Sequence, residues 1–92
     1  MLKFVKGEIV CSIFDDRFIG VFDRLVYDNS GEYVIAGGHV VSCFITSEDK
    51  FKYIEGTFEG FKKATRKQKD RFKRVLLENG YSYYKGKITQ EL

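Results

Sequence analysis

Hydrophobic residues follow two different periods along the chain, and the change between them divides the sequence. Up to residue 61, short runs of β-branched and aromatic residues alternate with polar turns, a pattern typical of strands. After residue 65, apolar residues recur at spacings of three and four, as on one side of a helix. We therefore expect a single domain over 1–92, with a β-rich part over 7–61, a basic helix and returning strand over 62–84, and a tail over 85–92.

The β-rich part is predicted to hold four strands and a short fifth one. Gly20 is a plausible kink or bulge in the second strand, because glycine inside a strand weakens the regular pairing. Residues 55–64 are predicted to form a loop whose Phe58 and Phe61 can fill the core. The strands are expected over 7–14, 18–27, 32–36, 39–46 and 51–54.

The helix has a recognisable start and end. Thr65 and Gln68 match a capping box, in which each side chain bonds to the backbone amide of the other residue. At the other end Asn79 and Gly80 supply a C-cap, since Gly80 enters the left-handed conformation without a Cβ clash. A helix over 66–79 follows, with Phe72, Val75 and Leu76 on its apolar side and a strand over 81–84 after it.

Together these elements predict an α+β fold. Four to five short antiparallel strands with turns every few residues indicate a small antiparallel β-barrel or strongly bent sheet of the SH3-like or OB-like type. One C-terminal helix and a short final strand would pack against it. An open antiparallel sheet with the helix across one side is the alternative.

The composition supports a packed core and argues against a metal site or a cofactor. Nine Phe and six Tyr among 92 residues are ample for one hydrophobic core. Cys11 and Cys43 lie in apolar runs and are expected to be reduced core thiols, with a disulfide between strands as the alternative. A single histidine and the lack of a C-x-x-C motif argue against a metal site, and we expect no cofactor.

The location is also predicted from hydropathy. No apolar run approaches the roughly 18 residues of a membrane span, and the first residues lack the apolar segment of a signal peptide. We therefore expect a cytoplasmic protein without a membrane partner.

The net charge of +3 hides a strong asymmetry between the two parts of the chain. Residues 61–92 hold ten Lys/Arg and three Asp/Glu, a net charge of +7, whereas residues 1–60 carry a net charge of −4. Five of the cations stand at the start of the helix, where the helix dipole already places positive charge. Local helix stability does not favour cations there, so a binding partner or the acidic part of the same molecule is expected to compensate them.

Few residues suggest catalysis. His39 is the only histidine, Asp15 and Asp16 form a short acidic turn, and Gly37-Gly38 lacks the spacing and lysine of a phosphate-binding loop. An enzyme needs a base, a nucleophile or a metal in a cleft. We expect no catalytic residue and a protein that works by binding.

The predicted contact surface is the basic side of the helix with the tyrosines after it. Two partner classes remain open for it. The first is a protein partner, either a host factor or a second copy, bound through complementary charge; the alternative is nucleic acid, bound through phosphate contacts and stacking on tyrosine. The candidate residues are Lys62, Lys63, Arg66, Lys67, Lys69, Arg71, Lys73, Arg74, Tyr83 and Tyr84.

The segment from Lys63 to Tyr83, K-A-T-R-K-Q-K-D-R-F-K-R-V-L-L-E-N-G-Y-S-Y, carries a resemblance as well. It resembles the ending of small uncharacterised proteins of Bacteroides-type bacteria and their phages. In those proteins an A-T pair opens a helix, an aromatic residue and a leucine mark its inner side, and G-Y plus an aromatic residue closes it. The positions that match here are Ala64, Thr65, Phe72, Leu76, Gly80, Tyr81 and Tyr83. The resemblance implies a phage or mobile-element setting and carries no catalytic residue to this chain.

Overall fold

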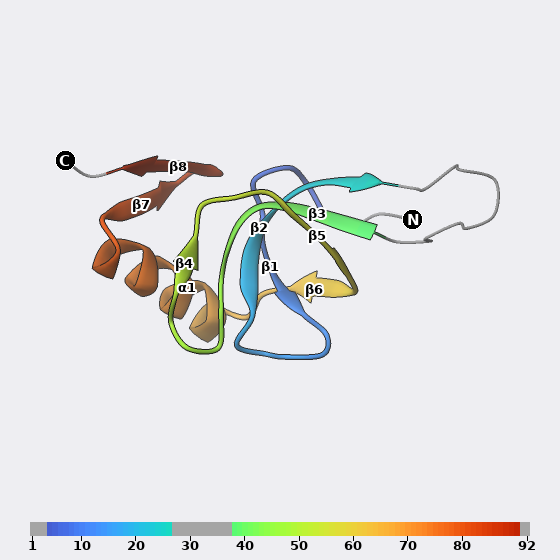
Figure 1. Cartoon of the computed structure of the whole chain (residues 1–92), viewed down its shortest axis with the longest axis horizontal. Helices are drawn as coiled ribbons and strands as arrows, with labels where there is room; N and C mark the ends of the chain where they lie inside the picture. Colours follow the sequence, from blue (N-terminus) through green and yellow to red (C-terminus); the bar gives the residue numbers. More distant parts are fainter. Residues whose placement is uncertain (1–3, 27–37, 91–92) are drawn as a thin grey trace.

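The computed structural model describes residues 4–26 and 38–90, except for the side chain of Val26, and it confirms the α+β class (Figure 1). One six-stranded antiparallel sheet, one helix and a two-stranded sheet make up this part of the chain. The predicted third strand, over 32–36, lies outside the described residues. The elements are β1 (Ile9–Ser12), β2 (Ile19–Val26), β3 (Gly38–Ile45), β4 (Phe51–Lys52), β5 (Gly56–Glu59), β6 (Phe61–Lys63), α1 (Arg66–Glu78), β7 (Tyr81–Tyr84) and β8 (Lys87–Gln90).

The large sheet runs in the order β4-β3-β2-β1-β6, and β5 pairs with β3 beside β4. The pairing of β2 with β3 shifts register between Gly20 and Phe22 and again between Phe22 and Arg24. The first shift confirms the irregularity predicted at Gly20. A Cβ atom on Gly20 would lie 2.9 Å from the carbonyl oxygen of Cys43, so the two backbones approach closely here.

A single residue, Gly60, separates two strands that belong to different parts of the sheet. β5 pairs with β3, whereas β6 pairs with β1 at the other edge. Gly60 has a φ of +72°, which glycine adopts without steric cost. The prediction of a loop over 55–64 is therefore wrong: pairing with strands distant in sequence overrides the weak strand propensity of this glycine-containing segment. Among the described strands no pairing closes the sheet into a ring.

The helix forms as predicted, and its C-terminal boundary differs by one residue. Thr65 and Gln68 make both bonds of the capping box, at 2.8 and 3.2 Å. Gly80, with a φ of +84°, follows the C-cap residue Asn79. Phe72, Val75 and Leu76 are fully buried, which confirms the apolar side of the helix, whereas the neighbouring Leu77 is 62% exposed.

The two faces of the large sheet pack against different clusters. Helix α1 covers one face, where Ile9, Cys11, Ile19, Cys43 and Ile45 meet the apolar side of the helix. On the other face Val10, Phe22, Val41 and Phe61 pack against a set of partly buried apolar residues, most of them aromatic. Both cysteines are buried and free, as predicted. Desolvation raises the pKa of the Cys43 thiol to about 11, so this thiol stays protonated at neutral pH.

Residues 85–90, expected to belong to a tail, form a tight turn and strand β8. Lys85 and Gly86 both have positive φ values, 47° and 83°, as a type I′ hairpin turn requires. Figure 1 shows the β7–β8 hairpin beside α1 at one end of the molecule. Tyr81, Tyr83 and Ile88 pack against the core under the helix. The hairpin therefore extends the core under the helix.

Two glycine backbones hold this hairpin against the turn that precedes β1. A Cβ atom on Gly7 would lie only 2.8 Å from the Cα atom of Gly86. The Tyr83 hydroxyl donates a hydrogen bond of 2.6 Å to the carbonyl oxygen of Gly7. Since burial raises the pKa of the Tyr83 phenol, this hydroxyl remains a donor at neutral pH.

We expect Gly7→Ala to loosen the hairpin. The φ of Gly7 is +93°, where an L-residue costs roughly 1–2 kcal/mol, and the added methyl group meets backbone that has no rotamer to change. Native-state hydrogen exchange should show faster exchange of the β7 and β8 amides, with the central β2–β3 amides much less affected. Unchanged exchange in the hairpin would contradict the described contact.

No helix within the described part of the chain is long and apolar enough to cross a membrane.

Candidate functional site

The cations of α1 lie in two rows on either side of its buried stripe. Residues spaced by three or four lie on the same side of a helix. Asp70 and Leu77, both exposed, lie between the rows on the solvent side. The predicted basic side of the helix is thus split, with one row formed by Arg66, Lys69 and Lys73 and the other by Lys67, Arg71 and Arg74.

Arg71 serves the fold and is not a free contact residue. Its side chain is only 16% exposed and donates to the carboxylate of Asp49 through Nε and Nη2, at 3.0 and 2.5 Å. The same guanidinium donates to the carbonyl oxygens of Thr46 at 2.9 Å and Arg17 at 2.5 Å. Arg74 approaches Asp49 at 3.9 Å with most of its side chain exposed.

The remaining predicted cations divide into engaged and unpaired ones. Lys73 lies over the ring of Tyr83 at 5.8 Å from its centroid, and Lys63 pairs with Glu8 at 3.6 Å. Four cations form no ion pair with any described carboxylate. They cluster at β6 and the first turns of α1, and we call them the basic cluster: Lys62, Arg66, Lys67 and Lys69.

The two predicted tyrosines differ in their availability. Tyr83 is half-buried, bonded to Gly7 and packed edge-on against Phe72. Its ring is therefore part of the core boundary. Tyr84 is 70% exposed with Lys85 over its ring at 5.4 Å, so it can offer a face to a partner.

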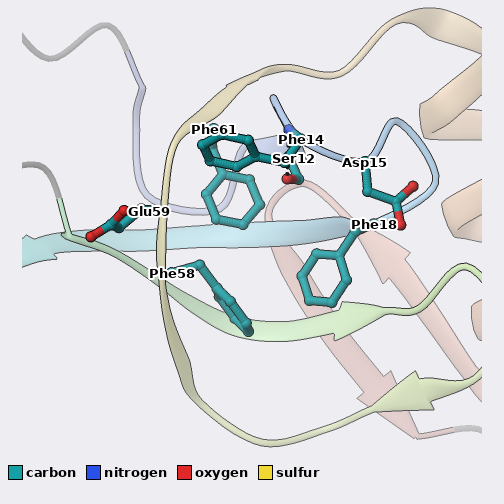
Figure 2. A pocket seen from close by; sticks show the side chains of 7 residues that line it. All are labelled: Ser12, Phe14, Asp15, Phe18, Phe58, Glu59 and Phe61. Atoms are coloured by element: carbon teal, nitrogen blue, oxygen red, sulfur yellow. Dashed lines mark hydrogen bonds between the residues drawn. The ribbon is translucent and has the colours of Figure 1, made fainter.

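A second candidate surface lies on the other side of the large sheet, between the β1–β2 turn and the β5–β6 link (Figure 2). It is an open pocket of about 280 Å³. In Figure 2, Phe14 and Phe61 lie close together on one side and Phe18 and Phe58 on the other. We call it the aromatic pocket, and its lining residues are Ser12, Phe14, Asp15, Phe18, Phe58, Glu59 and Phe61.

Three rings on the pocket wall hold one another in place. Phe18 and Phe58 meet edge-on with centroids 4.9 Å apart, and Phe58 and Phe61 do so at 5.9 Å. Phe44 stacks behind Phe18 at 5.0 Å. Such pairs favour fixed geometry beyond their buried area, so this wall is preformed.

Large apolar side chains stand exposed at the mouth of the pocket. Phe14 is 77% exposed and Ile13 is 54% exposed. The turn that carries them is tied down, because the Ile13 amide donates to the carbonyl oxygen of Gly60 at 3.2 Å. An ordered turn that holds two large apolar residues in water is a feature of contact surfaces.

The charged residues that line the pocket are acidic. Asp15 and Glu59 lie at opposite ends of the ring group in Figure 2. His39 stands deeper, where its ring packs against Phe4, Phe22 and Phe61 at centroid distances of 5.7–6.1 Å. These ring contacts make His39 part of the aromatic packing on this face of the sheet. Its Nδ1 is buried without a described hydrogen-bond partner.

A shallower hollow of about 320 Å³ lies where the hairpin meets the turn before β1. Tyr83, Lys85 and Glu8 contribute to its lining, together with the two contacting glycines. Glu8 directs one carboxylate oxygen to Lys63, and the other is buried without a described partner. Tyr83 is the only predicted site residue that lines this hollow.

The aromatic pocket was missed because it depends on tertiary structure. The sequence pattern predicts Ile13 and Phe14 at the end of a strand and residues 55–64 as a loop. One signal was present in the sequence: the apolar run over 9–11 ends at Ser12, and two further large apolar residues then stand directly before the polar Asp15-Asp16 turn. Apolar residues in such a position have no core face to enter.

Comparison with protein-family models, with curated proteins and with solved structures gives no match for this chain. The resemblance to small proteins of Bacteroides-type bacteria and their phages therefore stays a prediction.

Proposed function

We propose that this protein is a small binding module without catalytic activity, and that it acts by contacting another protein through the aromatic pocket and its mouth. The observation that carries the proposal is the exposed Phe14 beside an open, aromatic-lined pocket. Aromatic residues are enriched at the centres of protein interfaces, where they contribute much of the binding energy. The preformed wall supports binding because little ordering is required of it.

The resemblance of the C-terminal segment suggests the setting. A phage or mobile-element accessory protein of this kind would bind a host factor in the cytoplasm, a virion component or a second copy of itself. The charge asymmetry of the chain supports attraction toward a charged partner, because complementary potentials raise the association rate.

A photo-crosslinking experiment tests the proposal. The crosslinking amino acid p-benzoylphenylalanine replaces Phe14 in one variant and Tyr84 in the matched control, which is similarly exposed but lies on the β7–β8 hairpin. We expect a discrete crosslinked product in lysate, or with the purified protein alone for self-association, from position 14 and not from position 84.

Competition decides whether the product reflects a specific surface. Excess unlabelled wild-type protein should suppress the crosslink, whereas an equal excess of Phe14→Ser should not. Equal suppression by both competitors, or no product from position 14, would count against a protein-binding surface at the pocket.

The second candidate function is binding of nucleic acid, and the basic cluster favours it. Lys62, Arg66, Lys67 and Lys69 have no described acidic partner and gather around the start of α1. Phosphate groups bind favourably at such positions, because the N-terminus of the helix adds positive potential to that of the side chains. Tyr84 and the tyrosine-rich hairpin lie at the other end of the helix, which separates the stacking surface from the cations.

Salt dependence separates this function from the first. If the basic cluster binds phosphates, the affinity for single- or double-stranded oligonucleotides should fall with salt at a slope of about −0.7 to −0.9 per contact. Lys67→Gln/Lys69→Gln should reduce binding and this slope. The matched control Lys52→Gln/Lys87→Gln has the same net charge as Lys67→Gln/Lys69→Gln and should bind as tightly as the wild type. If neither the wild type nor any variant binds oligonucleotides at low salt, nucleic-acid binding is excluded.

We also propose that the sheet serves as a small barrel of the SH3-like or OB-like type. Support comes from the link at Gly60, because one residue connects a partner of β3 to a partner of β1 and so brings the two sides of the sheet together. The interior of the barrel would then be the cluster on the face opposite α1, formed by Val10, Phe22, Val41, Phe61 and the aromatic rings packed against them. The aromatic pocket would be the mouth of the barrel.

A further inference from the structure

We propose that the aromatic pocket recognises a cationic peptide segment, in which an aromatic or long aliphatic side chain stands next to lysine or arginine. This inference rests on the proposed protein-binding function and adds the chemistry of the partner. Two features of the pocket support it: the apolar wall and the acidic groups at the two ends.

The size of the pocket indicates a single side chain. Its volume of about 280 Å³ lies just below the roughly 300–1,000 Å³ typical of small-molecule sites. Phe18, Phe58 and Phe61 give the entering group an apolar wall. A bulky cofactor would exceed this space, whereas one apolar side chain of a peptide fits it.

Charge complementarity points to a cationic neighbour of that side chain. Asp15 and Glu59 line the pocket at opposite ends, and Asp16 follows Asp15 on the same turn. None of these three carboxylates forms an ion pair with a cation in the described part of the chain. An anionic segment would meet uncompensated repulsion here, and a cationic one would be attracted.

The cations nearest in sequence do not neutralise the pocket. Lys62 pairs with Cys11, which packs against the helix on the opposite face of the sheet from Phe61. Arg17 directs its guanidinium to Asp49 at 3.9 Å. The aromatic walls add to the preference, since a cation over a phenylalanine face is attracted to its negative quadrupole.

Three short peptides of equal length test the inference on the full chain: acetyl-Lys-Phe-Lys-amide, acetyl-Gln-Phe-Gln-amide and acetyl-Glu-Phe-Glu-amide. Binding is followed by shifts of backbone amide signals in ¹⁵N–¹H NMR spectra, with attention to residues 12–18 and 56–61. We expect the lysine peptide to shift these signals and to bind on the order of tenfold more tightly than the glutamate peptide.

The double variant Asp15→Asn/Glu59→Gln assigns the preference to the pocket. The Asp15 Oδ1 atom accepts from the Arg17 amide at 2.9 Å, and asparagine keeps an acceptor there, so the turn is retained. In this variant the advantage of the lysine peptide should shrink about fivefold, while binding of the glutamine peptide stays unchanged. The exposed pair Asp70→Asn/Glu78→Gln on α1 is the control with equal change in charge.

The outcomes separate the inference from the proposed function. Equal binding of all three peptides at the pocket overturns the cation preference and leaves a protein-binding surface in place. Absence of any shift at the pocket also overturns the inference, and the crosslinking from position 14 then decides the protein-binding function by itself.

Discussion

Leu76→Ala should destabilise the protein by about 2–5 kcal/mol, whereas Leu77→Ala should change its stability by no more than about 0.5 kcal/mol. The two leucines are neighbours in the same helix, so helix propensity is the same for both variants. Leu76 is fully buried among the residues that join α1 to the sheet, and Leu77 is 62% exposed. Removing the Leu76 side chain leaves a cavity that the packed core fills only in part.

Urea unfolding followed by circular dichroism measures both variants. Small domains have a total stability of roughly 5–15 kcal/mol, so the loss at Leu76 is a large share of it. Equal effects at the two positions would mean that the helix does not pack as described. Leu76→Met, which conserves volume, should cost less than about 1.5 kcal/mol and shows that the effect is one of packing.

Arg71→Met should cost about 2–3 kcal/mol, although residue 71 lies outside the apolar stripe of a basic helix. The guanidinium connects α1 to two loops, through the carbonyl oxygens of Arg17 and Thr46 and through Asp49. Hydrogen bonds from a charged donor contribute about 1.5–3 kcal/mol each and are not additive within one group. Methionine keeps the alkyl stem and the helix propensity, so the loss reports the hydrogen bonds.

The matched control is Arg74→Met, since Arg74 is largely exposed and only approaches Asp49 at 3.9 Å. It should stay within about 0.5 kcal/mol of the wild type. A similar cost at both positions would show that net charge, rather than the Arg71 contacts, sets the stability. Substitutions meant to test binding by the helix should therefore leave Arg71 in place.

Acidification gives a second test of the same contact. The hydrogen bond from Arg71 holds the pKa of the Asp49 carboxyl below its usual value near 3.9. Because the folded-state pKa is lowered, this stabilisation is present above about pH 4 and is lost as the pH falls through the folded-state pKa. The difference in stability between wild type and Arg71→Met should thus narrow below pH 4; a constant difference would contradict the role of Asp49.

Local signals explain which parts of the fold were predictable. The helix was located within one residue, since Thr65, Gln68 and Gly80 act through bonds within a few residues of each other. Its buried side followed from the spacing of Phe72, Val75 and Leu76. Strands β5 and β6 lie outside the predicted strands, because each is only three or four residues long and depends on a partner strand that is distant in sequence.

For the candidate site, the sequence predicts which residues are charged but not which of them are free to bind a partner. The sequence shows which residues are basic, but the partners of Arg71 and Lys63 come from loops and strands that only the fold brings near. The aromatic pocket depends on the bend at Gly60, which places Phe58 and Phe61 around the β1–β2 turn. No local pattern specifies that arrangement.

The pairing of β1 with β6 sets an order of events during protein synthesis. Val10 pairs with Lys63, so roughly fifty more residues must be synthesised after β1 before its partner strand β6 exists. The helix that covers Cys11 and Ile19 is made later still. Translation products that end before β6 therefore lack the means to shield these apolar strands and should aggregate.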